Sequence, residues 1–350
     1  MEKANQILSD VFSYDTFRGT QGPAIEAVIA GDDVFMLMMT SGGKSLVLQI
    51  PPLALNKPGI VISPLISLMQ DQVSSLVSRG VKACLLGSAQ IDPQVRERAF
   101  SGDYQLIYLT PELAVSESGR SQIAKLHETR GVSVLAIDEA HCISEWGHDY
   151  RPDYRKIGSL RSVLPGVPVV AVTATATPRV QREILESLNM MNSSLHIFRS
   201  SFERKNLRFE VVRHSPETLP EIARMARDVG PTIVYVLTTK QADTLAQELV
   251  EKCKIPAVAY HAKLEREVKQ RNHEAFLSDS AAVMVATLAY GMGIDKKNVR
   301  LVVHLGAPAS LEAYYQQVGG CLLLLLLLLR SRSRRSSRRA PLRRSYAGLM

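Results

Sequence analysis

Short apolar runs rich in Val, Ile and Leu alternate with amphipathic stretches along the chain up to about residue 318. Runs of this kind are typical of strands buried on both faces of a parallel sheet, whose crossover connections are helices. The runs fall into two series, so we expect two α/β lobes. The first series comprises residues 33–38, 59–63, 106–109, 132–137 and 167–173, and the second comprises 232–237, 257–260, 282–286 and 300–304.

Helix-like patterns lie between these runs, for example at 65–79, 178–188 and 240–253. Charged and polar residues cluster without an apolar face at 200–208, and we place the boundary between the lobes there. We therefore expect a first lobe at residues 1–199, a linker at 200–208, a second lobe at 209–320 and a low-complexity tail at 321–350.

The tail begins with eight leucines, 322–329, and continues as an Arg/Ser-rich stretch. Periodicity of either kind stops there, and low complexity with charge of one sign predicts disorder. Residues 330–350 hold eight arginines and no acidic residue, which accounts for the whole formal net charge of +8. Total charge is therefore no argument that the folded body binds nucleic acid.

Composition places the chain among globular, intracellular proteins. With 46% hydrophobic and 22% charged residues, wholesale disorder is excluded. The longest apolar run, 321–329, is too short to cross a bilayer, which needs ~20 residues, and the first residues lack a signal-peptide pattern. No Cys-x-x-Cys pair occurs, so we expect reduced thiols, no disulfide framework and no structural zinc; the cysteines are Cys84, Cys142, Cys253 and Cys321.

A glycine-containing loop follows the first apolar run and precedes a helix-like segment at 46–50. The loop reads Met39-Thr40-Ser41-Gly42-Gly43-Lys44-Ser45. Strand, glycine loop and helix in this order form a phosphate cradle, because backbone N–H groups and the helix N-terminus point at the same anion. In this interpretation Lys44 reaches the β- and γ-phosphates and Ser45 ligates Mg²⁺. The alternative is an ordinary glycine-rich turn, since Met38 stands where the full pattern has its first glycine.

Two adjacent carboxylates, Asp138 and Glu139, directly follow the apolar run 132–137. Acids at the carboxyl end of a buried strand suit a cation site, where Asp138 holds Mg²⁺ and Glu139 activates the water that attacks the γ-phosphate. Taken alone, the pair also fits a polar turn. Because ligands bind at the carboxyl ends of the strands in such sheets, both motifs are expected to converge, and together they predict nucleotide hydrolysis.

The motifs resemble those of the RecQ-type DNA helicases of helicase superfamily two, from about residue 12 to residue 319. Phe17-Arg18-Gly19-Thr20-Gln21 is similar to the family's entry motif, and the stretch from His141 through Trp146 to Tyr154 is similar to its aromatic-rich loop. Thr173-Ala174-Thr175-Ala176 and Tyr290-Gly291-Met292-Gly293-Ile294-Asp295 also match. The resemblance implies two RecA-like lobes of the P-loop NTPase class, with parallel sheets flanked by helices.

The resemblance also implies roles for individual residues. Catalysis would depend on Lys44, Asp138, Glu139 and His141, and Mg²⁺ on Ser45 and Asp138. ATP would be bound by Arg18 and Gln21 at the adenine, by the loop, and across the cleft, which gives the set Arg18, Gln21, Thr40, Ser41, Gly42, Gly43, Lys44, Ser45, Gly293, Asp295 and Gln316. Nucleic acid would be contacted by Ser63, Gln72, Thr110, Trp146, His148, Arg151, Thr173, Thr175, His261 and Thr287.

The chain departs from the family at the last motif. The family reads Gln-x-x-Gly-Arg-x-Gly-Arg, whereas this chain runs from Gln316 to Leu323 with Gly320 and Leu323 at the two arginine positions. Such arginines stabilise charge on the transferring phosphoryl group, and an arginine finger is worth ~10³–10⁵ in rate. Turnover is therefore expected to be impaired. The abrupt change after residue 319 is what a shifted reading frame or a retained intron would produce. Met39 and Ser41 also replace a Pro and a Gly in the phosphate loop.

The resemblance implies an ATP-dependent 3′-to-5′ DNA helicase that uses ATP and Mg²⁺, acts on single-stranded DNA and duplex junctions in repair and recombination, and has no membrane role. The nucleus is the expected location, or the cytoplasm in a prokaryote. Two alternatives remain: a nucleotide-regulated DNA-binding module with weak catalysis, favoured by the lost arginines, and an RNA-remodelling ATPase, since fold does not fix the substrate.

Overall fold

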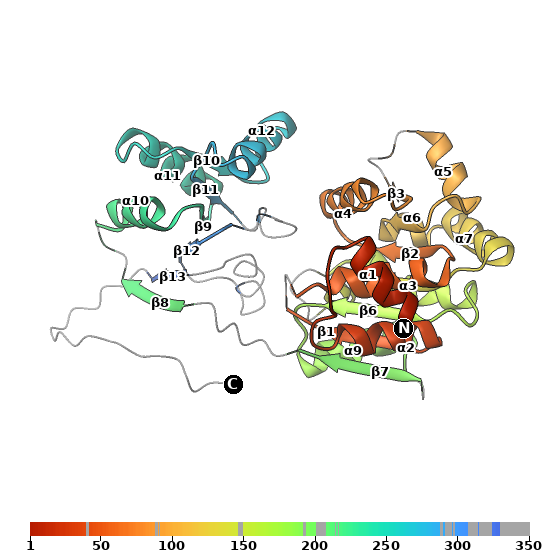
Figure 1. The fold of residues 1–350 in the computed structure, drawn as a ribbon. Helices are drawn as coiled ribbons and strands as arrows, with labels where there is room; N and C mark the ends of the chain where they lie inside the picture. Colours follow the sequence, from red (N-terminus) through yellow and green to blue (C-terminus); the bar gives the residue numbers. More distant parts are fainter. Residues whose placement is uncertain are drawn as a thin grey trace.

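The computed structural model of the chain describes residues 1–39, 42–87, 90, 92–145, 150–191, 194–200, 208–213, 215, 217–287, 290, 296, 298–306, 314 and 324–329. These residues form two separate sheets, each flanked by helices, which lie side by side in Figure 1. Every strand pair in both sheets is parallel. The expected fold of two RecA-like α/β lobes is confirmed.

The first sheet has seven strands in the order β3-β4-β2-β5-β6-β1-β7. Their bounds, in that order, are Ala83–Leu86, Leu106–Leu109, Gly59–Ile62, Val134–Ile137, Val169–Thr173, Asp33–Leu37 and Leu195–Arg199. The order matters for the site because β6 lies between β5 and β1. In a parallel sheet the loops that follow these three strands must meet at one edge.

Helices cover both faces of the first sheet. Side chains alternate along β1, so Val34 and Met36 pack on one face and Phe35 and Leu37 on the other. The first face is covered by α1 (Glu2–Asp10), α2 (Gln21–Ala30), α3 (Lys44–Leu55) and α4 (Ile66–Ser78). The second is covered by α5 (Pro93–Phe100), α6 (Pro111–Val115), α7 (Glu117–Arg130), η1 (Ala140–Ile143), α8 (Pro152–Arg155), η2 (Ile157–Ser162) and α9 (Pro178–Ser187).

The second sheet has six strands in the order β10-β11-β9-β12-β13-β8. Their bounds are Ala257–Tyr260, Val283–Ala286, Thr232–Val236, Leu301–Leu305, Leu324–Leu329 and Arg208–Arg213. One face packs against α10 (Thr218–Val229) and α11 (Thr239–Glu251), and the other against α12 (Arg266–Leu277). A capping box between Thr238 and Gln241 fixes the start of α11.

The leucine tract differs from its expectation. Residues 322–329 were expected to have no regular structure, but Leu324–Leu329 forms β13, which pairs with β12 on one side and β8 on the other. The physical reason is that a strand between two parallel neighbours needs only a continuous apolar run, and eight leucines supply one despite their low complexity. The Arg/Ser-rich stretch that follows lies outside the described residues.

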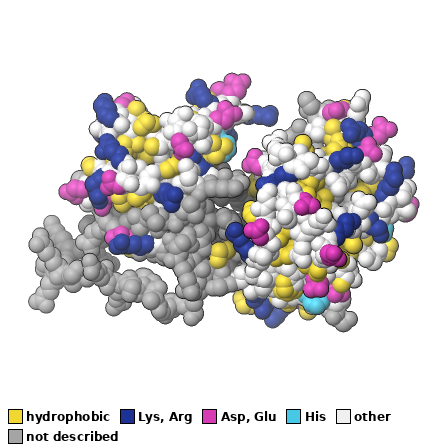
Figure 2. Space-filling model, in the orientation of Figure 1, with side chains coloured by type: hydrophobic (Ala, Val, Ile, Leu, Met, Phe, Trp, Pro, Cys, Tyr) yellow, Lys and Arg dark blue, Asp and Glu magenta, His cyan; other side chains and the backbone are white. Residues whose placement is uncertain are grey.

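All nine strands expected from the apolar runs are present, within one or two residues at each end. The sequence patterns missed β3, β7 and β8. Among the described helices, none combines the length and the apolar character that crossing a membrane requires. On the face drawn in Figure 2, the described basic and acidic side chains are interspersed over both lobes, in keeping with a body whose charges balance.

Candidate nucleotide-binding site

The phosphate loop joins the carboxyl end of β1 to α3, and its two described glycines are there for steric reasons. Gly43 is the N-cap of α3 with φ +85°, in the left-handed region that favours glycine. A Cβ on Gly43 would come within 2.3 Å of Gln21 Nε2, and one on Gly42 would lie 2.9 Å from the Met39 carbonyl oxygen. The loop backbone therefore packs too closely for larger residues. Lys44 and Ser45 follow as the first two residues of the helix.

Gln21, at the start of α2, holds this loop by hydrogen bonds to its backbone. Its Nε2 donates to the carbonyl oxygens of Gly42 (3.2 Å) and Gly43 (3.1 Å), and its Oε1 accepts from the Arg18 N–H (2.8 Å). The side chain is buried. The structure thus brings together the entry motif and the phosphate loop, which were both expected to bind ATP. The adenine contacts of Gln21 and Arg18 remain predictions.

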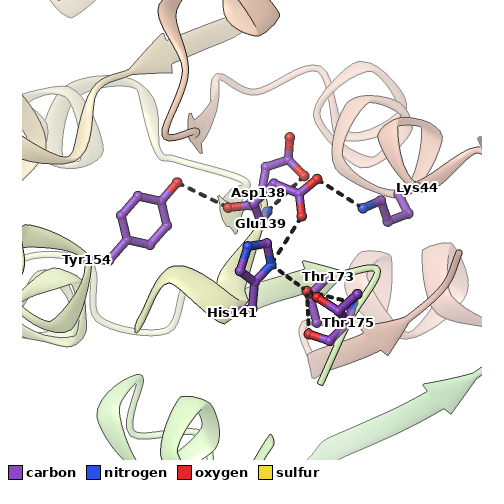
Figure 3. Close-up of polar contacts among 7 residues, drawn as sticks. All are labelled: Lys44, Asp138, Glu139, His141, Tyr154, Thr173 and Thr175. Carbon is purple, nitrogen blue, oxygen red and sulfur yellow. Dashed lines mark hydrogen bonds and ion pairs between the residues drawn. The ribbon is translucent and has the colours of Figure 1, made fainter. Parts of the chain in front are cut away.

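The acidic pair lies at the carboxyl end of β5 and meets the phosphate loop across β6. Lys44 Nζ is 3.3 Å from Glu139 Oε1, although 95 residues separate them, and both side chains are largely buried (Figure 3). Glu139 has φ +47°, a left-handed conformation that costs a residue with a Cβ ~1–2 kcal/mol. Backbone strain of this kind gathers at functional sites, where surrounding contacts hold it in place.

The two carboxylates titrate in opposite directions. Burial and the adjacent negative charge of Glu139 raise the pKa of Asp138 to about 6. Burial alone would also raise the pKa of Glu139, but the Lys44 ammonium and the His141 ring outweigh it and hold that pKa well below its usual range. The site therefore presents one carboxylate that is readily ionised and one, Asp138, whose charge is only partly compensated by Lys44 and the Glu139 N–H.

The donor set fits a magnesium ion. Mg²⁺ prefers a few hard oxygen ligands and is commonly held by one or two carboxylates together with substrate phosphates. Asp138 offers a carboxylate whose raised pKa shows that its negative charge is poorly compensated, and a divalent cation would remove that penalty. Ser45, in the first turn of α3, offers the hydroxyl. Lys44, Ser45 and Asp138 are the residues that would hold the metal–nucleotide complex.

His141 links the acidic pair to β6. Its Nδ1 lies 2.9 Å from Thr173 Oγ1 and 3.3 Å from Glu139 Oε2 (Figure 3). Thr173 Oγ1 donates its single proton to the Thr175 carbonyl oxygen at 3.1 Å, so it must accept from the histidine. This assigns a proton to Nδ1 of His141. The Glu139 carboxylate and the Thr173–Thr175 turn are thereby tied to one buried ring.

Two described residues near the C-terminal end of the aromatic-rich loop contact distant parts of the first lobe, while Trp146 and His148 lie outside the described residues. Arg151 donates from its guanidinium to the Pro64 carbonyl oxygen at 2.7 Å. The buried Tyr154 donates from its hydroxyl to the Asp138 carbonyl oxygen at 3.1 Å (Figure 3). Arg151 thus contacts the residue that follows Ser63, an expected DNA contact, and Tyr154 contacts the backbone of Asp138, an expected metal ligand.

The residues expected to contact nucleic acid follow the carboxyl ends of their strands. In the first lobe Ser63 follows β2, Thr110 follows β4 and Thr173 ends β6, all on one sheet edge. In the second lobe His261 follows β10 and Thr287 follows β11, which are neighbours. His261 Nε2 is 2.9 Å from Asp243 Oδ1. Thr40, Ser41, Gly293, Asp295 and Gln316 lie outside the described residues.

Tyr154 and Gln49 were missed as functional candidates. Tyr154 lies inside a quoted motif, but only the fold shows that its hydroxyl reaches Asp138. Gln49 had one usable signal, since it is a polar residue within the apolar stretch 46–50, and the structure buries it.

Comparisons with known proteins agree with this geometry. A family model described as DEAD/DEAH box helicase matches residues 18–184, and one described as helicase conserved C-terminal domain matches residues 214–321. The ATP-dependent DNA helicase RecQ of Haemophilus influenzae is 40% identical over 321 residues, which cover 90% of this chain and 51% of the relative. The chain belongs to the RecQ-type helicases.

Other matches define how far this RecQ-type assignment extends. Protein R290 of Acanthamoeba polyphaga mimivirus, which is named as an ATP-dependent RNA helicase, is also 40% identical over 321 residues, covering 91% of this chain and 58% of the relative. The chain thus spans about half the length of the curated relatives it matches. The structure of helicase MrfA bound to DNA has a TM-score of 0.75 at 16% identity, over 95% of this chain and 48% of that one, which shows the same fold.

Proposed function

We propose that this RecQ-type chain is the motor core of an ATP-dependent DNA helicase, which hydrolyses ATP to move 3′ to 5′ on single-stranded DNA and to open duplex junctions in repair and recombination. The observation that carries the proposal is the contact of 3.3 Å between Lys44 Nζ and Glu139 Oε1. It brings a phosphate-binding helix and an acid pair to one sheet edge, and hydrolysis needs both.

The proposed division of labour follows the geometry. The glycine loop and Lys44 bind the phosphates, Ser45 and Asp138 hold Mg²⁺, and Glu139 orients and deprotonates the attacking water. The low pKa of Glu139 keeps it ionised in the free chain, and its basicity rises when Lys44, whose charge lowers that pKa, turns to the phosphates. His141 contacts both Glu139 and Thr173 and so couples the position of the Glu139 carboxylate to the Thr173–Thr175 turn. Across the cleft, Gly293, Asp295 and Gln316 complete the ATP site.

We assign residues 1–199 and 209–320 to the two lobes and 200–208 to the linker, except that Arg208 already begins β8. Of the expected tail, 321–350, Leu324–Leu329 belongs to the second lobe as β13. Single-stranded DNA lies over the strand ends that carry Ser63, Thr110 and Thr173 in the first lobe and His261 and Thr287 in the second. Gln72, Trp146, His148, Arg151 and Thr175 complete this surface. The nucleus is the proposed location in a eukaryote, because the tail is rich in arginine, and the cytoplasm in a prokaryote.

Strand separation by the 350-residue chain tests the proposal. Duplexes with a 3′ or a 5′ single-stranded tail are mixed with Mg·ATP, and Glu139→Gln serves as the matched inactive variant. ATP-dependent opening of the 3′-tailed duplex by the wild type alone is the expected result. Equal opening of both duplexes by the Glu139→Gln variant would contradict the assignment of the base.

A second function is favoured by one feature, the Gly320 and Leu323 that stand at the two arginine positions of the last motif. If these losses stop turnover, the chain is a DNA-binding module regulated by nucleotide. Its signature is a change in single-stranded DNA affinity between ATP and ADP without phosphate release. The third reading, an RNA-remodelling ATPase, is separated by competition: RNA that displaces labelled DNA at equal concentration would favour it.

A further inference from the structure

A buried polar network connects the phosphate-binding helix α3 to α4, which carries Gln72 and most of residues 63–72, the stretch between the expected DNA contacts Ser63 and Gln72. Gln49 on α3 donates through Nε2 to Gln72 Oε1 on α4 at 2.7 Å. The same nitrogen donates to the Tyr108 hydroxyl of β4 at 3.1 Å. Gln49 is 4% exposed and Tyr108 is 3% exposed. Both N–H bonds of the Gln49 amide are therefore used, and water does not compete for them.

The network lies between the two halves of the proposed machinery. Lys44 is one and a half turns before Gln49 on the same helix, and Gln72 closes the segment 63–72 that follows β2. Close packing restrains both helices, and a hydrogen bond of 2.7 Å between a buried and a half-buried amide adds a restraint that depends on their relative orientation.

The middle of helix α3 is the weak part of its own hydrogen-bond ladder. Pro51 and Pro52 lie inside the helix and have no N–H, so the carbonyl groups of Val47 and Leu48 lack their usual partners four residues on. Gln49 lies in this part of the helix, one turn beyond the turn that carries Lys44, and its side chain ties the helix to α4.

We infer that Gln49 is a positioning residue that couples DNA engagement by α4 to the placement of Lys44 at the phosphates. The inference rests on the proposed function and deepens it. When α4 binds the DNA backbone and shifts, Gln72 shifts with it. The hydrogen bond from Gln49 to Gln72 then moves α3, the helix that carries Lys44. By linkage the effect is reciprocal, so nucleotide binding must change DNA affinity through the same bond.

Two substitutions separate coupling from stability. Gln49→Met keeps an unbranched side chain of similar length but removes both hydrogen bonds. Tyr108→Phe removes only the bond to β4 and leaves the bond between Gln49 and Gln72, so it is the matched control. Neither residue is assigned to ATP or DNA binding. Melting temperatures of all variants are recorded, and Gln49→Leu, with a more compact side chain, replaces Gln49→Met if the latter does not fold.

The readout is the affinity for a labelled oligo(dT), measured with and without Mg·AMP-PNP. This readout does not require turnover. We expect the nucleotide to change the DNA affinity of the wild type and of Tyr108→Phe. In Gln49→Met the ratio of the affinities with and without nucleotide should be smaller by at least about 5-fold, the low end of typical couplings. DNA affinity without nucleotide stays as in the wild type.

The outcomes distinguish the two claims. Full coupling in a folded Gln49→Met variant overturns the inference and leaves the proposed function intact. An equal loss in Tyr108→Phe also overturns it, because the effect then follows general disturbance of the buried network. If the DNA affinity of the wild type is the same with and without Mg·AMP-PNP, both the proposed function and the inference are overturned.

Discussion

At the scale of single residues, Lys44 and Glu139 form the contact on which the site depends. In the free chain the Lys44 ammonium pairs with Glu139 and lowers the pKa of its carboxyl group. When ATP binds, the ammonium can pair with a phosphate instead, and the carboxylate can then bind the attacking water. The same ion pair explains why Glu139 tolerates a left-handed backbone, since the bonds to Lys44 and His141 fix the side chain.

Removing the Lys44 ammonium is expected to weaken Mg·ATP binding by about 10- to 100-fold, because hydrogen bonds to charged groups contribute ~1.5–3 kcal/mol. The measurement is a fluorescence titration of Lys44→Ala with a labelled ATP. Lys57→Ala, at an exposed lysine of the same lobe, is the control and should bind as the wild type does. An unchanged affinity in Lys44→Ala would place the phosphates elsewhere.

Asp138 makes the free chain sensitive to pH. Its pKa is about 6 in the folded state and close to 3.8 when unfolded, so the folded state binds the proton more tightly. Relative to Asp138→Asn, the wild type should lose free energy of unfolding as the pH rises from about 4 to about 6. Urea denaturation in EDTA measures this. If the free energy of unfolding of the wild type relative to Asp138→Asn stays constant or rises over this pH range, the pKa of Asp138 is not raised in the folded state.

At the scale of elements, the junction of β1 and α3 shows what a motif contributes beyond its residue types. The sequence indicated that glycines let the backbone turn toward phosphate. The structure adds that Gln21 fills the space beside Gly43 and bonds the loop carbonyls. The loop is therefore shaped from α2 as well as from its own glycines.

Two glycine substitutions test this. Gly43→Ala puts a Cβ 2.3 Å from Gln21 Nε2, at φ +85°. Gly31→Ala, at φ +96° with nothing within 4 Å, carries comparable backbone strain in open space. Both should lose stability by ~1–2 kcal/mol, but Gly43→Ala alone should lose ATP binding. Equal ATP affinity of the two variants would mean that Gln21 does not shape the loop.

The elements also show where sequence patterns suffice. Buried strands such as β2 and β5 were recognised because both faces are apolar. Strand β7 escaped because it is an edge strand whose residues are partly exposed, so its pattern is not continuous. The left-handed backbone of Glu139, and the bonds of Gln49 and Tyr154, depend on residues far away in sequence, and no local pattern could have predicted them.

At the scale of the whole molecule, the second lobe depends on an unusual segment. Strand β13 separates β12 from β8, and among the described strands β8 pairs with β13 alone. Six leucines thus connect the first strand of the lobe to the rest of its sheet. His261 and Thr287, the proposed DNA contacts of this lobe, follow strands of the same sheet.

Two shortened chains test the role of β13. A chain that ends at Gly320 should show faster amide exchange in β8, which loses its one partner among the described strands, and to a smaller extent in β12, which keeps β9. A chain that ends at Leu329 keeps the strand and should match the full chain. Hydrogen–deuterium exchange of both reports the effect directly. Unchanged protection after removal of residues 321–350 would show that the leucine strand is dispensable.

The most direct test of the central claim is phosphate release from Mg·ATP by the full chain under single-turnover conditions, with saturating single-stranded DNA. We predict that the wild type releases phosphate ~10²–10⁴-fold faster than Glu139→Gln, the range expected for a general base, even though both arginine positions of the last motif are lost. Equal rates in the two chains, with ATP bound to both, would contradict the assignment of Glu139 and the hydrolytic reading of this site.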